Sequence, residues 1–570
     1  MRARISPSLR TAPLRASRSA ALCSPFTSIH TVGTTTHVTT APAAAKLHRP
    51  STPSRTFSQQ PCLCQPQIPS PPASPLTTSS TTPSSQNSPV PTSVAGFLAW
   101  TPAEAVSGVA IHGYVRSVRT MKKYTFVTLG DGSSITSLQA VVPAALVAAS
   151  SAEITNGAAV RLNGAWTPSP GAGQSHELHV TAFAVLGPSD AKTFPIQKKY
   201  QTPEFLRTLP HLRPRVPFNT TLLRFRSDVV SSLTRFFSER NYVQTHPPLI
   251  TSSDCEGAGE VFTVVGGAAS KQTNQQQAGE GFFRSDKYLT VSTQLHLEAL
   301  SQALGNVWTL SPTFRAEESD TPRHLSEFYM LEAEVGFAER MDEVMDLVED
   351  MLRFVASECR GSRTYDELLT RASTGNAAND LEDPKTVDQR WAGLLSHTPW
   401  PRITYAEALR LLQNAPVEFE HAPVWEQGLM TEHERYLARI VGGVEKPPVF
   451  VTHYPRVSKA FYMLPTERPA GSVPGTETVD CFDLLVPEFC EIAGGSMREH
   501  RLDQLLATMQ ARGMAFSPGG LDWYVDLRRW GCPPHGGFGM GFDRLLCYLT
   551  GVQTIRDMVA FPRWYGRCDC

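Results

Sequence analysis

The segment FRAEESDTPRHLSEF, residues 314–328, carries the clearest signal for the fold. Seven of its fifteen residues are Arg, His, Glu or Asp, and it separates the apolar runs GNVWTLSPT and YMLEAEVGF. Alternating residues in these runs predict two strands joined by a charged hairpin loop. On the second strand, Leu331 and Ala333 take one face, while Glu332 and Glu334 take the other.

The hairpin has two interpretations from its residues alone. If the first strand continues to residue 317, Arg315 and Glu317 share a face, and the loop adds Arg323 and His324. Such residues can clamp a phosphate by arginine, while a carboxylate accepts from an exocyclic amine and Phe328 stacks on a purine. A hairpin closed by surface ion pairs would have the same composition.

Two later segments favour the first interpretation. GFGMGFDRLLCYLTG, residues 537–551, has alternating glycines and then a helix predicted from Phe542, with Arg544 in its first turn, where anions bind. DLLVPEFCEIAGGSMRE, residues 483–499, brings Asp483 and Glu491 near Arg498, a set suited to Mg²⁺ beside phosphates. The chain contains no P-loop motif.

The charge is distributed unevenly along the chain. Residues 1–103 contain eight Lys or Arg and no Asp or Glu, although the whole chain of 570 residues has a net charge of −1. An acid-free, Arg- and Ser-rich N-terminus is typical of an organelle import sequence. We therefore expect a mitochondrial transit peptide over residues 1–57 and a Pro/Ser/Thr-rich linker over residues 58–93. An arbitrary basic tail is the alternative.

The remaining chain reads as two domains of the α+β class. Five short strands over residues 94–188 predict a small barrel of the oligonucleotide-binding (OB) type. Residues 189–215 form a basic, proline-rich hinge. Residues 216–570 predict a mostly antiparallel sheet flanked by helices, with a helical insertion at about residues 340–420.

These motifs together resemble those of the class II aminoacyl-tRNA synthetases. FRAEESDTPRHLSEF resembles motif 2, GFGMGFDRLL resembles motif 3, and the helix from Leu222 through YVQTHPPLI resembles motif 1. DCEGAGEVF, STQLHLEAL, EIAGGSMRE and PPHGGFGMGFDR are similar to the asparaginyl branch of the family. The resemblance implies activation of asparagine by ATP, transfer to tRNA(Asn) and a homodimer, and the expected transit peptide implies the mitochondrial matrix.

The resemblance also assigns roles to residues. Arg315 and Arg544 would be catalytic, clamping the α- and γ-phosphates of ATP. The wider ATP site would comprise Glu317, Arg323, His324, Phe328, Asp483, Glu491 and Gly541, with Asp483 and Glu491 holding Mg²⁺.

The amino-acid pocket would contain Glu256 and Gln294 for the α-amino group, with His535 beside them. Glu298 and Arg498 would recognise the carboxamide, because a carboxylate accepts from an amide NH₂ and repels a second carboxylate. The alternatives are an exposed helix carboxylate for Glu298 and a structural histidine for His535.

In the barrel, the resemblance assigns tRNA contacts to Arg119, Phe126 and Gln139, although alternation does not settle which face carries Phe126. Two other functions stay open. One is an aspartate–tRNA ligase, including one that charges both tRNAs. The other is an RNA-binding protein with an inactive synthetase domain.

Overall fold

The computed structural model describes residues 90–171, 173–252, 260–265, 282–283, 285–373, 381–467, 473, 475–514 and 520–570. In these ranges, no helix combines the length and hydrophobicity that a membrane span requires.

The N-terminal domain is a closed barrel of five strands in the order β1-β2-β3-β5-β4. Its strands are β1 (Val106–Thr120), β2 (Tyr124–Gly130), β3 (Leu138–Pro143), β4 (Ala159–Pro168) and β5 (His176–Gly187), with helices α1 (Val94–Ala99) and α2 (Ala144–Ala148). Val127, Leu129 and Leu138 are among the buried residues that fill its interior. The predicted five-stranded barrel is confirmed.

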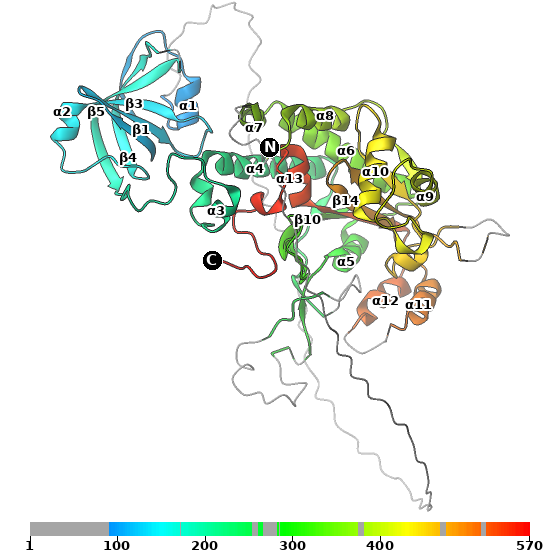
Figure 1. Ribbon diagram of the computed structural model, residues 1–570. Coiled ribbons are helices and arrows are strands. Elements are labelled where there is room, and N and C mark those ends of the chain that lie inside the picture. Colours follow the sequence, from blue (N-terminus) through cyan, green and yellow to red (C-terminus); the bar gives the residue numbers. More distant parts are fainter. Residues whose placement is uncertain are drawn as a thin grey trace, which may run out of the picture. The chain divides into compact units, whose positions relative to one another are not determined.

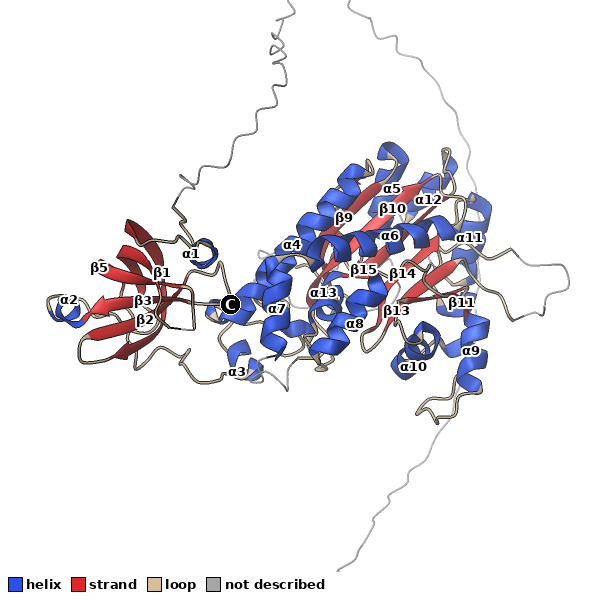
Figure 2. Ribbon diagram, turned by 90° about the horizontal axis from the view of Figure 1, so that it is seen from above, coloured by secondary structure: helices blue, strands red, loops and turns tan. Residues whose placement is uncertain are grey.

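After the short helix α3 (Pro203–Arg207), the second domain is built on an eight-stranded sheet in the order β11-β12-β13-β14-β15-β10-β9-β6 (Figures 1 and 2). Neighbours from β12 to β9 are antiparallel, and the pairs at both ends are parallel. The strands are β6 (Val243–Gln244), β9 (Val307–Phe314), β10 (Glu327–Gly336), β11 (Arg402–Thr404), β12 (Val449–Thr452), β13 (Cys481–Val486), β14 (Cys490–Met497) and β15 (His535–Gly541). A separate ribbon pairs β7 (Ile250–Thr251) with β8 (Tyr288–Leu289).

Helices cover this sheet (Figure 2). They are α4 (Pro217–Glu239), α5 (Gln294–Leu304), α6 (Met341–Arg360), α7 (Arg363–Ser373), α8 (Pro384–Leu394), α9 (Tyr405–Gln413), α10 (Thr431–Gly442), α11 (Leu502–Ala511), α12 (Asp522–Arg529) and α13 (Phe542–Thr550). The main core joins α4, α6 and α13 to Leu331 and Ala333 of β10. The predicted α+β class is therefore confirmed, and α6, inside the predicted insertion, belongs to this core.

Two strands differ from the prediction. The strand expected to continue to residue 317 ends at Phe314, so Arg315 and Glu317 lie in the hairpin loop. Phe337 lies beyond the end of β10 with a left-handed φ of 60°. Within β10, the alternation holds, because Leu331 and Ala333 enter the core while Glu332 accepts hydrogen bonds from Ser292 and Thr293 beside α5.

Candidate active site

Strand register defines a site face on the sheet, opposite the main core. Directly paired residues share a face, so Asp483, Gly494, Gly539 and Glu332 form one row across four strands. Ser496, Gly537 and Glu334 form the neighbouring row. Gly537 and Gly539 leave the centre of β15 without side chains on this face, and charged residues surround the gap.

Motif 2 residues meet at one edge of the site face. The Arg315 guanidinium lies 5.8 Å from the centre of the Phe328 ring, and its Nη1 lies 3.9 Å from Glu317 Oε1. His324 Nε2 is 3.1 Å from Glu317 Oε2. Arg323 points elsewhere and donates to the carbonyl oxygen of Glu488 at 3.0 Å, in the turn before β14. A cation, a carboxylate and an aromatic ring are thus grouped as a purine nucleotide requires.

Two carboxylates converge beside Gly494. A Cβ on Gly494 would lie 3.3 Å from Asp483 Oδ1 and 3.2 Å from Glu491 Oε1. Asp483 accepts both its bonds from Lys459 Nζ, at 2.7 and 3.0 Å. The charge of Asp483, with burial, raises the pKa of Glu491. Arg544, in the first turn of α13 as predicted, donates to the carbonyl oxygen of Glu491 at 2.6 Å, and Gly541 precedes that helix.

A third carboxylate, Glu434 of α10, accepts from the backbone N–H of Glu491 at 3.3 Å. Burial and the charges of Glu491 and Asp483 raise its pKa to about 7. Among the described residues, no group of three or more His, Cys, Asp or Glu could hold a metal ion.

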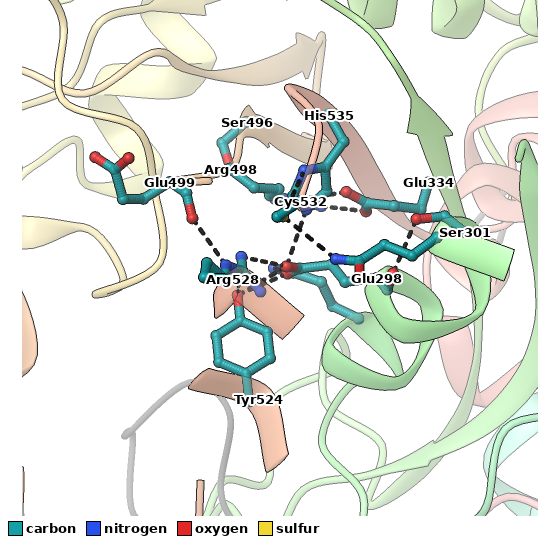
Figure 3. Close-up of polar contacts among 12 residues, drawn as sticks. Glu298, Ser301, Glu334, Ser496, Arg498, Glu499, Tyr524, Arg528, Cys532 and His535 are labelled. Atoms are coloured by element: carbon teal, nitrogen blue, oxygen red, sulfur yellow. Dashed lines mark hydrogen bonds and ion pairs between the residues drawn. The ribbon is translucent and has the colours of Figure 1, made fainter. Parts of the chain in front are cut away.

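Glu298 lies at the centre of a buried polar network (Figure 3). Its side chain is 0% exposed, so the alternative of an exposed helix carboxylate is wrong. It accepts from Arg528 Nη2 at 2.6 Å, from the Tyr524 hydroxyl at 2.8 and 3.0 Å, and from Gln294 Nε2 at 3.1 Å. Burial alone would raise the pKa of Glu298, but Arg528 and His535 outweigh it, and the pKa falls well below its ordinary value.

The hydrogen-bond partners of His535 indicate that its imidazole is protonated on both nitrogens and positively charged. Nε2 lies 3.2 Å from Glu298 Oε2, and Nδ1 lies 2.8 Å from the carbonyl oxygen of Pro533. Both partners only accept, so both ring nitrogens carry hydrogen. Burial alone would lower the pKa of His535, but Cys532 and Glu298 raise it to about 10.

Arg498 holds the other side of the network. Its Nε and Nη2 donate to the two oxygens of Glu334 at 3.1 and 3.0 Å, and its Nη1 donates to Ser496 Oγ at 2.6 Å. Glu334 and Arg498 are 0% and 3% exposed. A buried bidentate pair of this kind fixes the direction in which the guanidinium presents its remaining N–H groups.

The remaining predicted site residues belong to α5, to the barrel and to a segment outside the described residues. Gln294, the first residue of α5, reaches Glu298 one helical turn on. Glu256 is outside the described residues. In the barrel, Arg119 pairs with Phe126, and Gln139 pairs with Thr128, two residues from Phe126. All three therefore share one face, and Val127 and Leu129 fill the core from the other face, so Phe126 lies on the outside.

Sequence reasoning missed four polar residues of the site: Lys459, Glu434, Tyr524 and Arg528. Lys459 stands in the segment RVSKA, residues 456–460, and a single lysine there gives no signal of a site. Tyr524 and Arg528 share one face of an eight-residue helix. This spacing is also typical of an ordinary surface helix, and gives no signal of a site.

The antiparallel sheet, with an arginine after β9 and another at the start of α13 beside paired carboxylates, defines the architecture of the class II tRNA synthetases. The chain belongs to the family "tRNA synthetases class II (D, K and N)", whose model matches residues 202–565. A model of the OB-fold nucleic acid binding domain matches residues 109–186. The resemblance found in the sequence is confirmed.

Individual relatives agree. The chain is 40% identical over 482 residues to a mitochondrial asparagine–tRNA ligase of Saccharomyces cerevisiae, covering 80% of this chain and 92% of the relative. It is 41% identical to an asparagine–tRNA ligase of Pelobacter propionicus, covering 81% and 96%. Among solved structures, asparaginyl-tRNA synthetase from Pyrococcus horikoshii complexed with asparaginyl-adenylate has a TM-score of 0.66 and 28% identity, covering 81% and 96%.

Proposed function

We propose that this chain is an asparagine–tRNA ligase, which joins L-asparagine to ATP as asparaginyl-adenylate and then transfers it to tRNA(Asn). The observation that carries the proposal is Glu298, a buried carboxylate held ionised in the position that the sequence assigns to the substrate carboxamide. Relatives about 40% identical over most of their length carry the same name.

The first step is attack of the asparagine α-carboxylate oxygen on the α-phosphorus, with release of pyrophosphate. The nucleophile is already ionised, so the site needs no general base and acts by orientation and charge stabilisation. Arg315 contacts the α-phosphate and Arg544 the γ-phosphate. Phe328 stacks on adenine, and Glu317 accepts from its amine, with Arg323, His324 and Gly541 lining the same site.

Asp483 and Glu491 would hold Mg²⁺, for which carboxylate oxygens converging on one space are a suitable donor set. The ion supplies positive charge to the ATP phosphates when it is bound. In this structure Lys459 forms an ion pair with Asp483 and compensates its negative charge. Isothermal titration of Mg²⁺ tests the assignment: Asp483→Asn should weaken the binding, and unchanged affinity would contradict it.

Asparagine would bind through Glu256 and Gln294 at the α-amino group, and through Glu298 and Arg498 at the carboxamide, with His535 beside them. Arg119, Phe126 and Gln139 would contact the anticodon. The long helix α4 would contribute to a homodimer interface, so sedimentation should give a dimer, and a monomer at micromolar concentration would contradict it.

The N-terminal residues would direct the chain to the mitochondrial matrix. In an import assay with isolated mitochondria, residues 1–93 fused to a reporter should confer potential-dependent protection from protease. A reporter that stays outside would contradict the assignment.

The decisive experiment is ATP–pyrophosphate exchange with asparagine and aspartate compared on the same protein. Exchange with asparagine alone supports the proposal. Exchange with aspartate would keep the family and overturn the specificity. Exchange with neither would favour the RNA-binding alternative.

A further inference from the structure

Helix α12 supplies two buried side chains that contact the proposed carboxamide acceptor. Arg528 and Glu298 are each 0% exposed by side chain, and the pair is 2.6 Å apart. Two charges in such a place require each other, because removing one leaves the other buried without compensation.

The hydrogen bonds fix the direction of the protons that Tyr524 and Arg528 donate to Glu298. Arg528 Nη2 also donates to the Tyr524 hydroxyl oxygen at 2.8 Å, so the hydroxyl hydrogen points to Glu298. Arg528 Nε donates to the carbonyl oxygen of Glu499 at 2.9 Å, which anchors the guanidinium independently (Figure 3). Tyr524 and Arg528 therefore act as one unit on the carboxylate.

A carboxylate has about four acceptor positions. Arg528 Nη2 and His535 Nε2 lie 2.6 and 3.2 Å from Oε2, and the Tyr524 hydroxyl lies 2.8 Å from Oε2 and 3.0 Å from Oε1. The fourth donor, on Oε1, is the side-chain amide of Gln294 at 3.1 Å. This donor is uncharged, and it is a carboxamide, the same chemical group as the asparagine side chain.

We infer that Tyr524 and Arg528 are positioning residues for amino-acid selection: they hold Glu298 ionised and leave on Oε1 a position for a neutral N–H donor, which Gln294 fills here. This inference rests on the proposed function. An asparagine side chain can donate an N–H there in place of Gln294, which turns away. An aspartate carboxylate has no hydrogen to donate, so it meets Oε1 as one acceptor facing another.

The test measures kcat/KM for asparagine and for aspartate by ATP–pyrophosphate exchange on the full chain. Tyr524→Phe and Arg528→Lys should each lower the ratio of the two values by about tenfold or more. KM for ATP should not change. As the pH falls from 8 to 5.5, the ratio should fall further in the variants, because Glu298 with fewer donors accepts a proton more readily. The wild-type ratio should stay constant.

Two matched controls remove equivalent groups elsewhere. Tyr405→Phe deletes a buried hydroxyl that donates to the carbonyl oxygens of Val424 and Trp425. Arg390→Lys alters a buried guanidinium paired with Glu488 at 3.0 Å. Neither should change the ratio.

The inference would be wrong, and the proposed function would stand, if the wild type selects asparagine and the α12 variants keep the wild-type ratio at every pH. Variants that lose activity with both amino acids equally would also overturn it, since that result describes a structural role. A wild type that activates aspartate as well would overturn the proposed function itself.

Discussion

Arg315 and Arg544 come from distant parts of the chain, and in the proposed function they act on one nucleotide. Arg315 lies against Phe328, while Arg544 reaches the backbone of Glu491. Each would face charge that develops on the phosphates during attack, where preorganised donors contribute most.

Replacing either arginine should therefore remove adenylate formation while the fold persists. We expect Arg315→Ala and Arg544→Ala each to lower kcat/KM in pyrophosphate exchange by about 100-fold or more. Circular dichroism should match the wild type. Arg410→Ala, which removes a surface arginine 71% exposed by side chain, is the control. Exchange near the wild-type rate in either site variant would contradict the phosphate assignments.

His535 makes stability depend on pH. The folded protein holds its proton up to a pKa of about 10, whereas the ordinary value is 6.5. Its contribution to stability is therefore complete below pH 6.5 and is lost as the pH rises towards 10.

The difference in free energy of unfolding between wild type and His535→Asn should shrink from pH 6.5 to pH 10, measured by urea denaturation. His433 is the control, since it is also buried, but its Nδ1 accepts from the backbone N–H of Met430, whereas Nδ1 of His535 faces a carbonyl oxygen. His433→Asn should show no such trend. A constant difference for His535→Asn would show that its imidazole is not charged.

At the scale of elements, β15 determines how closely the strands of the site face approach. A Cβ on Gly537 would lie 2.1 Å from Glu334 Oε2 and 2.4 Å from the carbonyl oxygen of Ala333. On Gly539 the nearest atom would be Met330 Cε at 3.0 Å, the flexible end of a side chain. A side chain at Gly537 would therefore clash with fixed atoms, whereas a side chain at Gly539 would meet only a group that can move.

Gly537→Ala should lower the free energy of unfolding by about 2–3 kcal/mol and disturb the Glu334–Arg498 pair. Gly539→Ala, two residues along, should cost much less, because the methionine can move. Thermal denaturation of both variants checks this. Equal losses would mean that the strands separate easily, and that Gly537 is not required by close contact.

Some elements and site residues could be predicted from the sequence, and others could not. Arg544 in a first turn and the two faces of β10 follow from local periodicity, which reports local geometry well. The partners of Glu298 did not follow, because Arg528 is 230 residues away and only the folded sheet brings them together. The end of β9 at Phe314 was also missed, since the strand ends where charged side chains enter the site.

At the scale of the whole molecule, two domains divide the reaction. The barrel places Arg119, Phe126 and Gln139 on one outer surface, and the activation residues lie on the sheet of the other domain. Amino-acid activation and tRNA selection should therefore respond to different substitutions.

Phe126→Ala should raise KM for tRNA(Asn) about tenfold, since a base stacked on an aromatic ring is worth about 1–3 kcal/mol. Pyrophosphate exchange should stay at the wild-type rate. Phe183→Ala, which shortens a partly buried ring packed on the barrel core, controls for general loosening of the barrel. An equal effect of both on tRNA would remove Phe126 from the contact surface.

The order of the sheet has a consequence for synthesis. β15 lies between β10 and β14 in the sheet, although both of these strands precede it in the chain and are made earlier. The two halves of the sheet cannot join until residues 535–541 have been made, because the strand between them does not yet exist. The sheet of a nascent chain therefore stays open at its centre, and a premature stop before residue 535 leaves two unpaired strand edges exposed to aggregation.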